Sequence, residues 1–471
     1  MTAPSGGLAR RLALGFSGQA FSRLVFAINT VALVPILIHA WGLNGYGQWI
    51  ALTALASYMS YSNFGLVTTS ANEMVMAAGA GDDLRARRTF QMSLNLTFYF
   101  IAPILLVLLA LASIAPLSQV LRLTEISNHA AFLVLVFVAA QFWFQTVRGL
   151  MVAALYATGS YALGYYIAGT AKLAELVAVA VAVTLFHGSQ VTVAAIIAGA
   201  ALIDLTVITI VARRAARWAR LDFRVFDGAW VLSQAKPTIG FAISNLSTMG
   251  VLIQAPRVIL SALLGGQAVA IYTVYGTAMR LMDQLLLMLV LPLEVEIAHT
   301  VGRKAFDQTY RLVTFGTQFS WILFTAVAAF LMLAGPLVFH VWTRGQVAFS
   351  YGFMALYLVM SACNQLGRVS AHALISTNRL YGPSFVMLAL SIAAVALGGV
   401  LTTYLKLPGM VIGGIFGELS NSLVVIAAFA AWMNKPIAAF FVDQLDPRAS
   451  FAELKARAGQ VLLRLRRASG A

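Results

Sequence analysis

The sequence predicts an all-α polytopic membrane protein with about twelve transmembrane helices, arranged as two parallel six-helix repeats around a central cavity. Three observations lead to this prediction: the composition of the chain, the spacing of its long apolar segments and the uneven distribution of its lysines and arginines. Of the 471 residues, 61% are hydrophobic and only 10% are charged, whereas a soluble globular domain carries about 25% charged residues. This composition excludes a soluble protein and indicates a chain that spans a bilayer many times.

Twelve apolar segments are long enough to cross a bilayer, which requires about 20 helical residues each. They lie at residues 13–39, 46–68, 90–114, 130–152, 161–186, 190–212, 238–264, 268–293, 312–339, 349–375, 381–404 and 408–433. The first segment follows Arg10 and Arg11 and is longer than the apolar core of a cleaved signal peptide, so we expect a retained helix. The connection at His187 and Gly188 is so short that the segments on either side must form a helical hairpin.

The loops between these segments alternate in charge. One side carries 22 lysines and arginines, and the other side carries three: Arg122, Arg344 and Lys406. The basic side comprises the N-terminus, the loops 69–89, 213–237 and 299–311, the turn 376–380 and the C-terminal tail. Because cytoplasmic loops collect Lys and Arg, both termini are predicted to be cytoplasmic. The formal net charge of +15 then reports topology, and no nucleic-acid partner is predicted.

The two halves of the chain resemble each other. Three spaced residues recur 223 positions later, namely Glu73, Gly79 and Arg88 as Glu296, Gly302 and Arg311. Short matches also arise by chance in Ala- and Leu-rich helices, but charged and glycine positions at constant spacing favour a repeat. An offset of six spans preserves orientation, which predicts two parallel repeats, a design found in transporters that rock two bundles around a central site. The predicted units are an N-terminal lobe at 1–230, a C-terminal lobe at 231–435 and a basic tail at 436–471.

The tail contains a segment, 447–467, that is too short to span a bilayer. Its apolar residues fall on one helical face and its basic residues elsewhere. This pattern predicts an amphipathic helix lying on the anionic inner leaflet, with docking of a partner protein as the alternative.

Ten ionisable residues fall inside the predicted spans. They are Arg23, Arg148, Lys172, Glu175, Asp204, Arg257, Arg280, Asp283, Arg368 and Glu418. Each costs about 2.5 to 3.5 kcal/mol at bilayer depth, so such residues normally face a bundle interior or a water-filled cavity. Arg23 and Arg257 lie deep in the first spans of the two halves and are the favoured cavity cations, with Arg280 as a third candidate. A guanidinium presents a planar fork of donors that matches phosphate oxygens, which predicts a pyrophosphate ligand.

Some of these charges have simpler interpretations. Arg280 and Asp283 are three residues apart on one helix, as are Lys172 and Glu175, so each pair is also a candidate local ion pair. Two further arginines, Arg148 and Arg368, lie near predicted cytoplasmic helix ends. There, snorkelling of the side chain to the headgroups is the favoured interpretation.

Asp204 and Glu418 have no cation within one turn of their own helices. In a transporter, an unpaired membrane carboxylate is a candidate for binding a coupling H⁺ or Na⁺, and Asp283 is a third candidate. The alternative is a hydrogen bond to a nearby hydroxyl or amide, since Asn421 and Ser422 adjoin Glu418.

No catalytic group or bound cofactor is predicted. The six histidines show no metal-ligand spacing on a shared helix face, and Cys363 is the single cysteine, so no metal site is predicted. The sequence has no phosphate-binding Gly-rich loop with Lys and Ser or Thr, which excludes an internal ATPase.

Several short motifs occur in order along the chain. They are Gly42-Leu43-Asn44-Gly45-Tyr46-Gly47-Gln48-Trp49, Ser62-Asn63-Phe64-Gly65-Leu66, Gly265-Gly266 through Ala270-Ile271-Tyr272, Arg280 with Pro292 and Glu294, and Val341-Trp342-Thr343-Arg344-Gly345. Together, over residues 13–435, they resemble the polysaccharide transporter branch of the multidrug/oligosaccharidyl-lipid/polysaccharide (MOP) exporter superfamily. Within this branch, O-antigen (Wzx-type) flippases and exporters of capsule or exopolysaccharide are the nearest likeness.

This resemblance implies a non-enzymatic flippase of the bacterial inner membrane that translocates undecaprenyl-pyrophosphate-linked oligosaccharides by alternating access. The implied partners are the lipid-linked substrate, membrane lipids and the polysaccharide polymerase or chain-length machinery. The alternative is a multidrug or metabolite antiporter of the same superfamily, which would use an acidic cavity for cationic drugs. A membrane glycosyltransferase or polymerase is less favoured because it needs a large outer loop, and the longest one predicted is 115–129.

Overall fold

The computed structural model describes residues 5–60, 66–79, 82–158, 160–216, 242–302, 304–377 and 379–445, together with residues 218, 219, 222, 227, 228, 232, 239 and 240. Across this part of the chain the secondary structure is helical without a strand, which confirms the predicted all-α fold. The amphipathic helix predicted at 447–467 and the basic side chains Arg10 and Arg11 lie outside what the structure describes.

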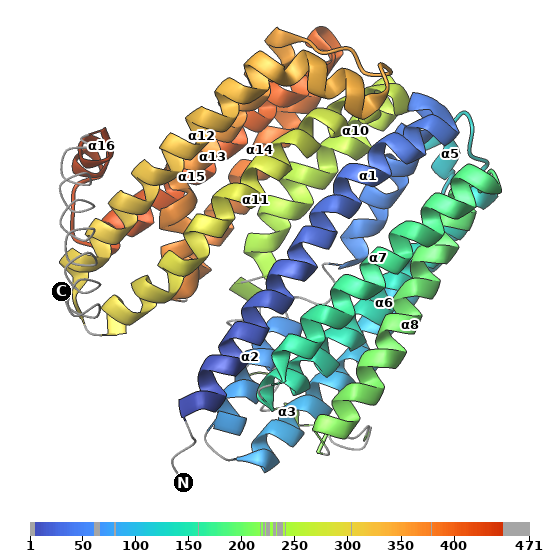
Figure 1. Ribbon diagram of the computed structural model, residues 1–471. Coiled ribbons are helices and arrows are strands. Elements are labelled where there is room, and N and C mark those ends of the chain that lie inside the picture. The colour runs from blue at the N-terminus through green and yellow to red at the C-terminus, as the bar shows by residue number, and fades with distance from the viewer. Residues whose placement is uncertain are drawn as a thin grey trace, which may run out of the picture.

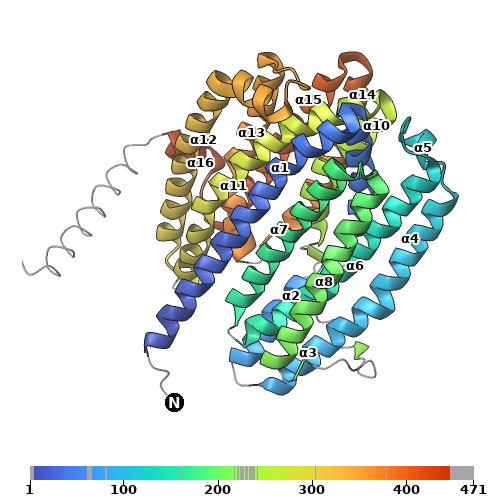
Figure 2. The same cartoon turned by 45° about the vertical axis from the view of Figure 1, so that its right-hand side comes forward.

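The N-terminal half forms a bundle that we call the N lobe. Its elements are α1 (Ser5–Ser60), α2 (Leu66–Gly79), α3 (Asp83–Leu96), the π-helix η2 (Thr97–Ile101), α4 (Ala102–Ile114), α5 (Leu117–Val120), α6 (Asn128–Ala157), α7 (Tyr161–Leu185) and α8 (Gln190–Ala215). Figure 2 shows α3 and α4 in line at the edge of this lobe, and together with η2 they make one long crossing. The first two predicted spans are joined in α1, which is kinked at Gly42.

The C-terminal half forms the C lobe. Its elements are the π-helix η3 (Leu246–Gln254), α10 (Ala255–Leu264), α11 (Gly266–Gly302), α12 (Phe306–Thr343), α13 (Tyr351–Ser376), α14 (Tyr381–Leu405), α15 (Leu407–Trp432) and the short α16 (Ile437–Leu445). Nine helices in the described residues are both long and apolar enough to cross a membrane, and α1 among them is long enough to do so twice. With α11 and α13, which have 37 and 26 residues, the described helices account for each of the twelve predicted segments, except at residues 61–65, 238 and 241, which lie outside the described residues.

The backbone itself repeats between the lobes. Left-handed residues recur in pairs at nearly constant offsets: Gly42 (φ 67) and Gly265 (φ 82), Arg122 (φ 49) and Arg344 (φ 52), and His187 (φ 50) and Lys406 (φ 58). The offsets of 223, 222 and 219 positions match those of the sequence repeat, so the structure supports two parallel repeats. All six residues follow odd-numbered spans and therefore lie at one end of the bundle, which we call the Gly42 end.

The lobes meet at the Gly42 end and diverge toward the opposite end, where Figure 1 places the N-terminus. Hydrogen bonds from side chain to backbone join the two lobes. They connect Ser261 Oγ to the carbonyl of Leu121 (2.6 Å), Arg122 Nη1 to that of Leu263 (3.0 Å) and Trp342 Nε1 to that of Val31 (2.9 Å). Deeper in the bundle, Tyr58 Oη donates to the carbonyl of Gly250 (3.0 Å). The largest apolar core also crosses the contact between the lobes, since Leu37 and Leu52 of the N lobe belong to one cluster with Tyr275 and Phe339 of the C lobe.

Candidate functional site: a cationic cavity in the C lobe

A cavity of about 960 Å³ opens within the C lobe, between η3, α10, α11, α13, α14 and α15. All of its lining residues lie between positions 240 and 418, so the C lobe alone forms its wall. The lining includes three arginines and two carboxylates: Arg257, Arg280, Arg368, Asp283 and Glu418. These groups separate into an arginine pair and a polar network.

The arginine pair comprises Arg257 at the start of α10 and Arg280 in the middle of α11. Arg257 Nη1 donates to Gln254 Oε1 at 2.8 Å and Arg280 Nη2 donates to Thr277 Oγ1 at 2.5 Å. Within the described residues, neither guanidinium has a carboxylate within 4.0 Å, and the Nε of Arg257 is buried without a hydrogen-bond partner. The two cations also lie close enough to repel each other. Buried, mutually repelling guanidinium groups without a described carboxylate within 4.0 Å leave positive charge uncompensated in the cavity wall.

Tyrosines surround the arginine pair. Tyr357 Oη donates to the carbonyl of Tyr272 at 2.7 Å, and the two rings pack at a centroid distance of 5.6 Å. Tyr46, a buried residue of α1, lies near both Arg257 and Arg280. A side chain of the N lobe therefore adjoins the arginine pair of the C lobe.

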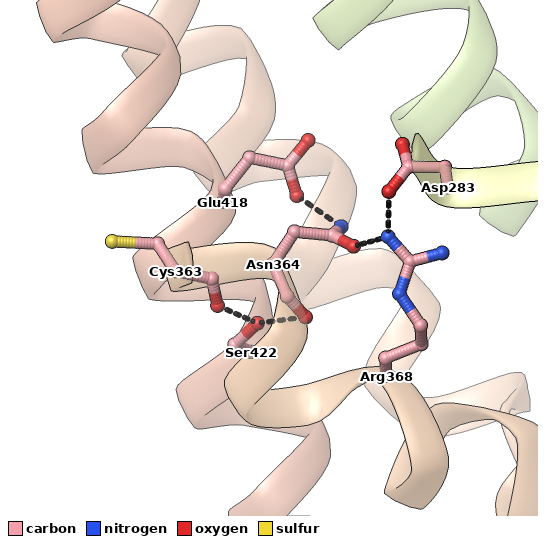
Figure 3. A network of polar contacts seen from close by, with 6 residues as sticks. All are labelled: Asp283, Cys363, Asn364, Arg368, Glu418 and Ser422. Carbon is pink, nitrogen blue, oxygen red and sulfur yellow. Dashed lines mark hydrogen bonds and ion pairs between the residues drawn. The ribbon is translucent and has the colours of Figure 1, made fainter. Parts of the chain in front are cut away.

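The polar network connects three helices (Figure 3). Asn364 of α13 donates through Nδ2 to Glu418 Oε2 of α15 at 2.6 Å, and it accepts through Oδ1 from Arg368 Nη2 at 2.6 Å. Arg368 also forms an ion pair with Asp283 of α11. Ser422 fastens α15 to α13 through a hydrogen bond of 2.7 Å to the carbonyl of Cys363. The network thus holds two carboxylates and one arginine in the cavity wall.

The ion pairs correct several sequence interpretations. A local pair between Arg280 and Asp283 is wrong, because Asp283 pairs with Arg368. Snorkelling of Arg368 and Arg148 is also wrong, since Arg148 of α6 pairs with Asp204 of α8. The premise that Asp204 is unpaired fails for the same reason: its partner lies on a neighbouring helix, which the sequence of α8 alone does not reveal.

Two other interpretations agree with the structure. Lys172 and Glu175 form the expected local ion pair, with Nζ and Oε1 2.5 Å apart. Glu418 accepts a hydrogen bond from an amide, but the donor is Asn364 of α13. The neighbour Asn421 instead donates to Ser391 Oγ at 2.9 Å.

The structure places the predicted cavity cations differently. Arg257 and Arg280 line the cavity, whereas Arg23 is a half-buried residue of α1 outside its lining. Within the described residues Arg23 makes no ion pair with Asp or Glu. A role for Arg23 in binding substrate stays a prediction.

Sequence reasoning missed Asn364 and the tyrosines, although a signal for them exists. Polar residues recur in α13 at steps of three or four, at Tyr357, Ser361, Asn364, Arg368 and His372, and all five line the cavity. This helical spacing marks one polar face on an otherwise apolar helix.

Comparisons with known proteins identify the fold. No protein-family model and no curated protein matches this sequence. Solved structures do match: an inward-facing multidrug resistance MATE family transporter of the MOP superfamily superposes with a TM-score of 0.66 at 16% identity, over 91% of this chain and 98% of that one. The chain shares its fold with MATE transporters of the MOP superfamily.

Two further structures agree. An outward-facing MATE family transporter gives a TM-score of 0.60 at 15% identity, covering 90% of this chain and 96% of that one. A MOP superfamily transporter from Pyrococcus furiosus gives 0.59 at 16% identity, covering 92% and 95%. The two-lobed, multi-pass fold that the sequence predicts is therefore confirmed, and it is the fold of the superfamily that the sequence motifs resemble.

Proposed function

We propose that this protein exports an anionic, lipid-linked substrate by alternating access, and that the substrate is an undecaprenyl-pyrophosphate-linked oligosaccharide. The observation that carries the proposal is the arginine pair, Arg257 and Arg280, in the wall of the cavity without a carboxylate partner. A pyrophosphate supplies the missing negative charge and accepts the free guanidinium donors.

The size and lining of the cavity suit the polar part of such a lipid. Tyrosine rings beside the arginines offer apolar faces and hydroxyl groups to a sugar, while the prenyl chain stays in the bilayer. A cavity of about 960 Å³ falls near the upper end of typical small-molecule sites.

The arrangement of the lobes supports alternating access. They are joined at the Gly42 end and apart at the opposite end, where α1 begins, which the Lys and Arg distribution predicts to be cytoplasmic. The inward-facing MATE structure superposes better than the outward-facing one, with TM-scores of 0.66 and 0.60. Both observations favour an inward-open state of an inner-membrane protein.

A multidrug antiporter is the second candidate, because the superposed structures include multidrug resistance transporters. A pocket for cationic drugs needs carboxylates in excess, whereas this cavity has three arginines for two carboxylates. The Pyrococcus furiosus transporter is described as having a binding pocket of reversed polarity that suggests a different function. Charge in the pocket is therefore the criterion by which we separate the two candidates.

Ligand-induced thermal stabilisation of the purified protein tests the proposal directly. Undecaprenyl pyrophosphate should raise the unfolding temperature of the wild type, and Arg257→Ala or Arg280→Ala should remove this effect. Arg214→Ala is the matched control, since Arg214 is an exposed arginine at the end of α8, and it should respond like the wild type. Stabilisation by the cationic dye ethidium but not by undecaprenyl pyrophosphate would establish the multidrug alternative.

A null strain tests the substrate in the cell. Lipid-linked repeat units should accumulate on the cytoplasmic side, and surface glycan should return on complementation. A null strain with unchanged surface glycan and unchanged lipid-linked intermediates would refute the assignment.

A further inference from the structure

In the polar network of the cavity wall, two carboxylates contact a single arginine, directly or through an amide. Asp283, Arg368 and Glu418 are joined through Asn364, so two carboxylates share one arginine. Arg280 lies near enough to Asp283 to stabilise its charge, but among the described cations only Arg368 interacts with Glu418. Glu418, whose described hydrogen bond comes from an amide and not from a cation, is the carboxylate of this network that favours the uptake of a proton.

The equivalent arginines of the two lobes form different ion pairs. Arg148 of α6 lies 220 positions before Arg368 of α13, and α6 and α13 are the fourth helical spans of their lobes. Arg148 pairs with Asp204 of α8, the sixth span. In the C lobe the equivalent arginine pairs instead with Asp283 of α11, and the sixth-span carboxylate, Glu418, is left with an amide.

The additional carboxylate causes this difference. Asp283 lies 223 positions after Ser60, so the N lobe has a hydroxyl residue where the C lobe has an acid. At the repeat offset of 219 positions, Asp204 corresponds to Leu423 of α15. Glu418 lies five residues before Leu423, and thus nearer the Gly42 end of this helix. At 1.5 Å per residue this is a displacement of about 7.5 Å, which Asn364, one turn before Arg368, bridges.

The orientation of the Asn364 amide follows from chemistry. Arginine has only donors, so the amide oxygen must face Arg368 and the amide nitrogen must face Glu418. The group facing Glu418 is therefore an N–H donor. A metal cation requires oxygen ligands at this place, whereas a carboxyl group accepts this bond whether or not its other oxygen is protonated.

We propose that Glu418 is a proton-binding site and that Arg368 is shared between Asp283 and Glu418 according to whether that proton is bound. With the proton bound, Arg368 stays on Asp283, as in this structure, and the network is neutral. Without the proton, Glu418 attracts Arg368 toward α15. The resulting pair between α13 and α15 corresponds to the pair between Arg148 of α6 and Asp204 of α8 in the N lobe.

The groups that face Glu418 are few. Asp283 and Tyr272 of α11 and Arg368 and Cys363 of α13 interact with it electrostatically. Three other described helices pack against α15, namely α14, α16 and α10. Helix α14 carries no Asp, Glu, Lys, Arg or His between Tyr381 and Leu405. Asp443 of α16 and Arg257 of α10 are the ionisable residues of the other two, and neither interacts with Glu418. Arg368 is therefore the single described cation that responds to the charge of Glu418.

This exchange reaches the contact between the lobes. Arg368 binds Asp283 of α11, and α11 begins at Gly266, against α1 of the N lobe. Moving Arg368 from Asp283 to Glu418 releases a link between α13 and α11 and adds one between α13 and α15. Proton exchange is thereby linked to the helix that holds the lobes together.

Infrared difference spectroscopy of the purified full-length protein, titrated with acid, tests this proposal without any substrate. Its outcome is thus separate from that of the proposed function. The wild type should show a protonated-carboxyl band that Glu418→Gln removes. Asp283→Asn frees Arg368 for Glu418, so the midpoint of the band should fall by about one pH unit or more. Asp307→Asn, in the exposed first turn of α12, is the control and should match the wild type.

Arg368→Gln should shift the midpoint in the opposite direction, and it serves as a second test if Asp283→Asn fails to fold. Removing the arginine leaves two carboxylates without a cation, so the midpoint should rise. Persistence of the band in Glu418→Gln assigns the proton elsewhere and overturns the proposal. A midpoint that stays in place in Asp283→Asn and Arg368→Gln shows that Arg368 is not shared, which also overturns it.

Discussion

Gly47 of the N lobe and Gly266 of the C lobe meet backbone to backbone. A Cβ atom on Gly47 would lie 1.6 Å from the carbonyl oxygen of Gly266, and one on Gly266 would lie 2.5 Å from the carbonyl oxygen of Asn44. These distances leave no room for a side chain, so the contact between the lobes depends on glycine at both positions.

We expect Gly47→Ala to push the lobes apart at the Gly42 end. Inserting a methyl group into a tight contact typically costs about 1 to 3 kcal/mol, enough to shift a two-state equilibrium markedly toward the state in which this contact is open. Distances between spin labels on the two lobes should lengthen at the Gly42 end. Gly199→Ala is the control, because a Cβ there meets nothing within 4 Å; equal distances in both variants would contradict the prediction.

Replacing Arg257 or Arg280 should weaken substrate binding, because each replacement removes a planar set of hydrogen-bond donors from the cavity wall. A charge-assisted hydrogen bond contributes about 1.5 to 3 kcal/mol, or roughly 10- to 150-fold in affinity. Arg257→Ala and Arg280→Ala should therefore abolish surface polysaccharide at normal protein abundance, and Lys at either position should rescue only in part because it lacks the planar fork. Arg23→Ala, outside the cavity lining, tests whether the N lobe adds a third cation. Full surface glycan in all three Ala variants would show that these arginines are structural.

The ion pair between Arg148 and Asp204 should stabilise the N lobe. Both side chains are largely buried, with 18% and 14% exposure, so Asp204→Asn leaves an uncompensated charge and should cost about 3 kcal/mol. The double variant Arg148→Gln/Asp204→Asn should regain part of this loss. Thermal unfolding in detergent measures the cycle, and additive losses would show that the two residues do not interact.

Transport should respond to a pH gradient and not to a Na⁺ gradient. Flux of lipid-linked substrate in proteoliposomes should change when the pH difference is imposed or reversed, because Glu418 exchanges a proton. Glu418→Gln should remove this response, while Asp307→Asn should keep it. Flux that depends on Na⁺ alone would contradict the prediction.

Both termini are expected to be cytoplasmic. Reporter fusions after Trp218, in the basic loop between the lobes, and after Leu445, at the end of α16, should report a cytoplasmic location. Fusions after Arg122 or His187, at the Gly42 end, should report the periplasm. The reverse pattern would show that the protein has the opposite orientation in the membrane, and the observed state would then be outward-open.

The sequence predicts the helices of this protein well because bilayer thickness imposes a simple rule on each span. Length and hydropathy suffice to find α6 or α14, and the offsets in the repeat suffice to pair the lobes. The kink that joins the first two spans in α1 is less predictable. It depends on Gly42 adopting φ 67 and ψ 173. Glycine reaches a positive φ at many kinds of site, including helix ends and turns, so the residue type alone does not predict a kink.

The site is less predictable because its partners come from different helices. The spacing on one helix finds the pair of Lys172 and Glu175, but it misassigns Asp283, whose arginine lies on α13. Arg257 is recognisable as a deep cation, whereas its lack of a partner appears only once neighbouring helices are packed. Asn364 gives no signal as a single residue and becomes visible only as part of the polar face of α13.

All the residues that line the cavity lie in one lobe, and this has a thermodynamic consequence. A ligand held by the C lobe alone keeps the same contacts whichever side the bundle opens to, so its affinity is nearly equal on the two faces of the membrane. A ligand with equal affinity for two states does not bias the equilibrium between them. In that case the arginines of the cavity select what is carried, and net direction comes from the proton gradient that acts on Glu418 in the same wall.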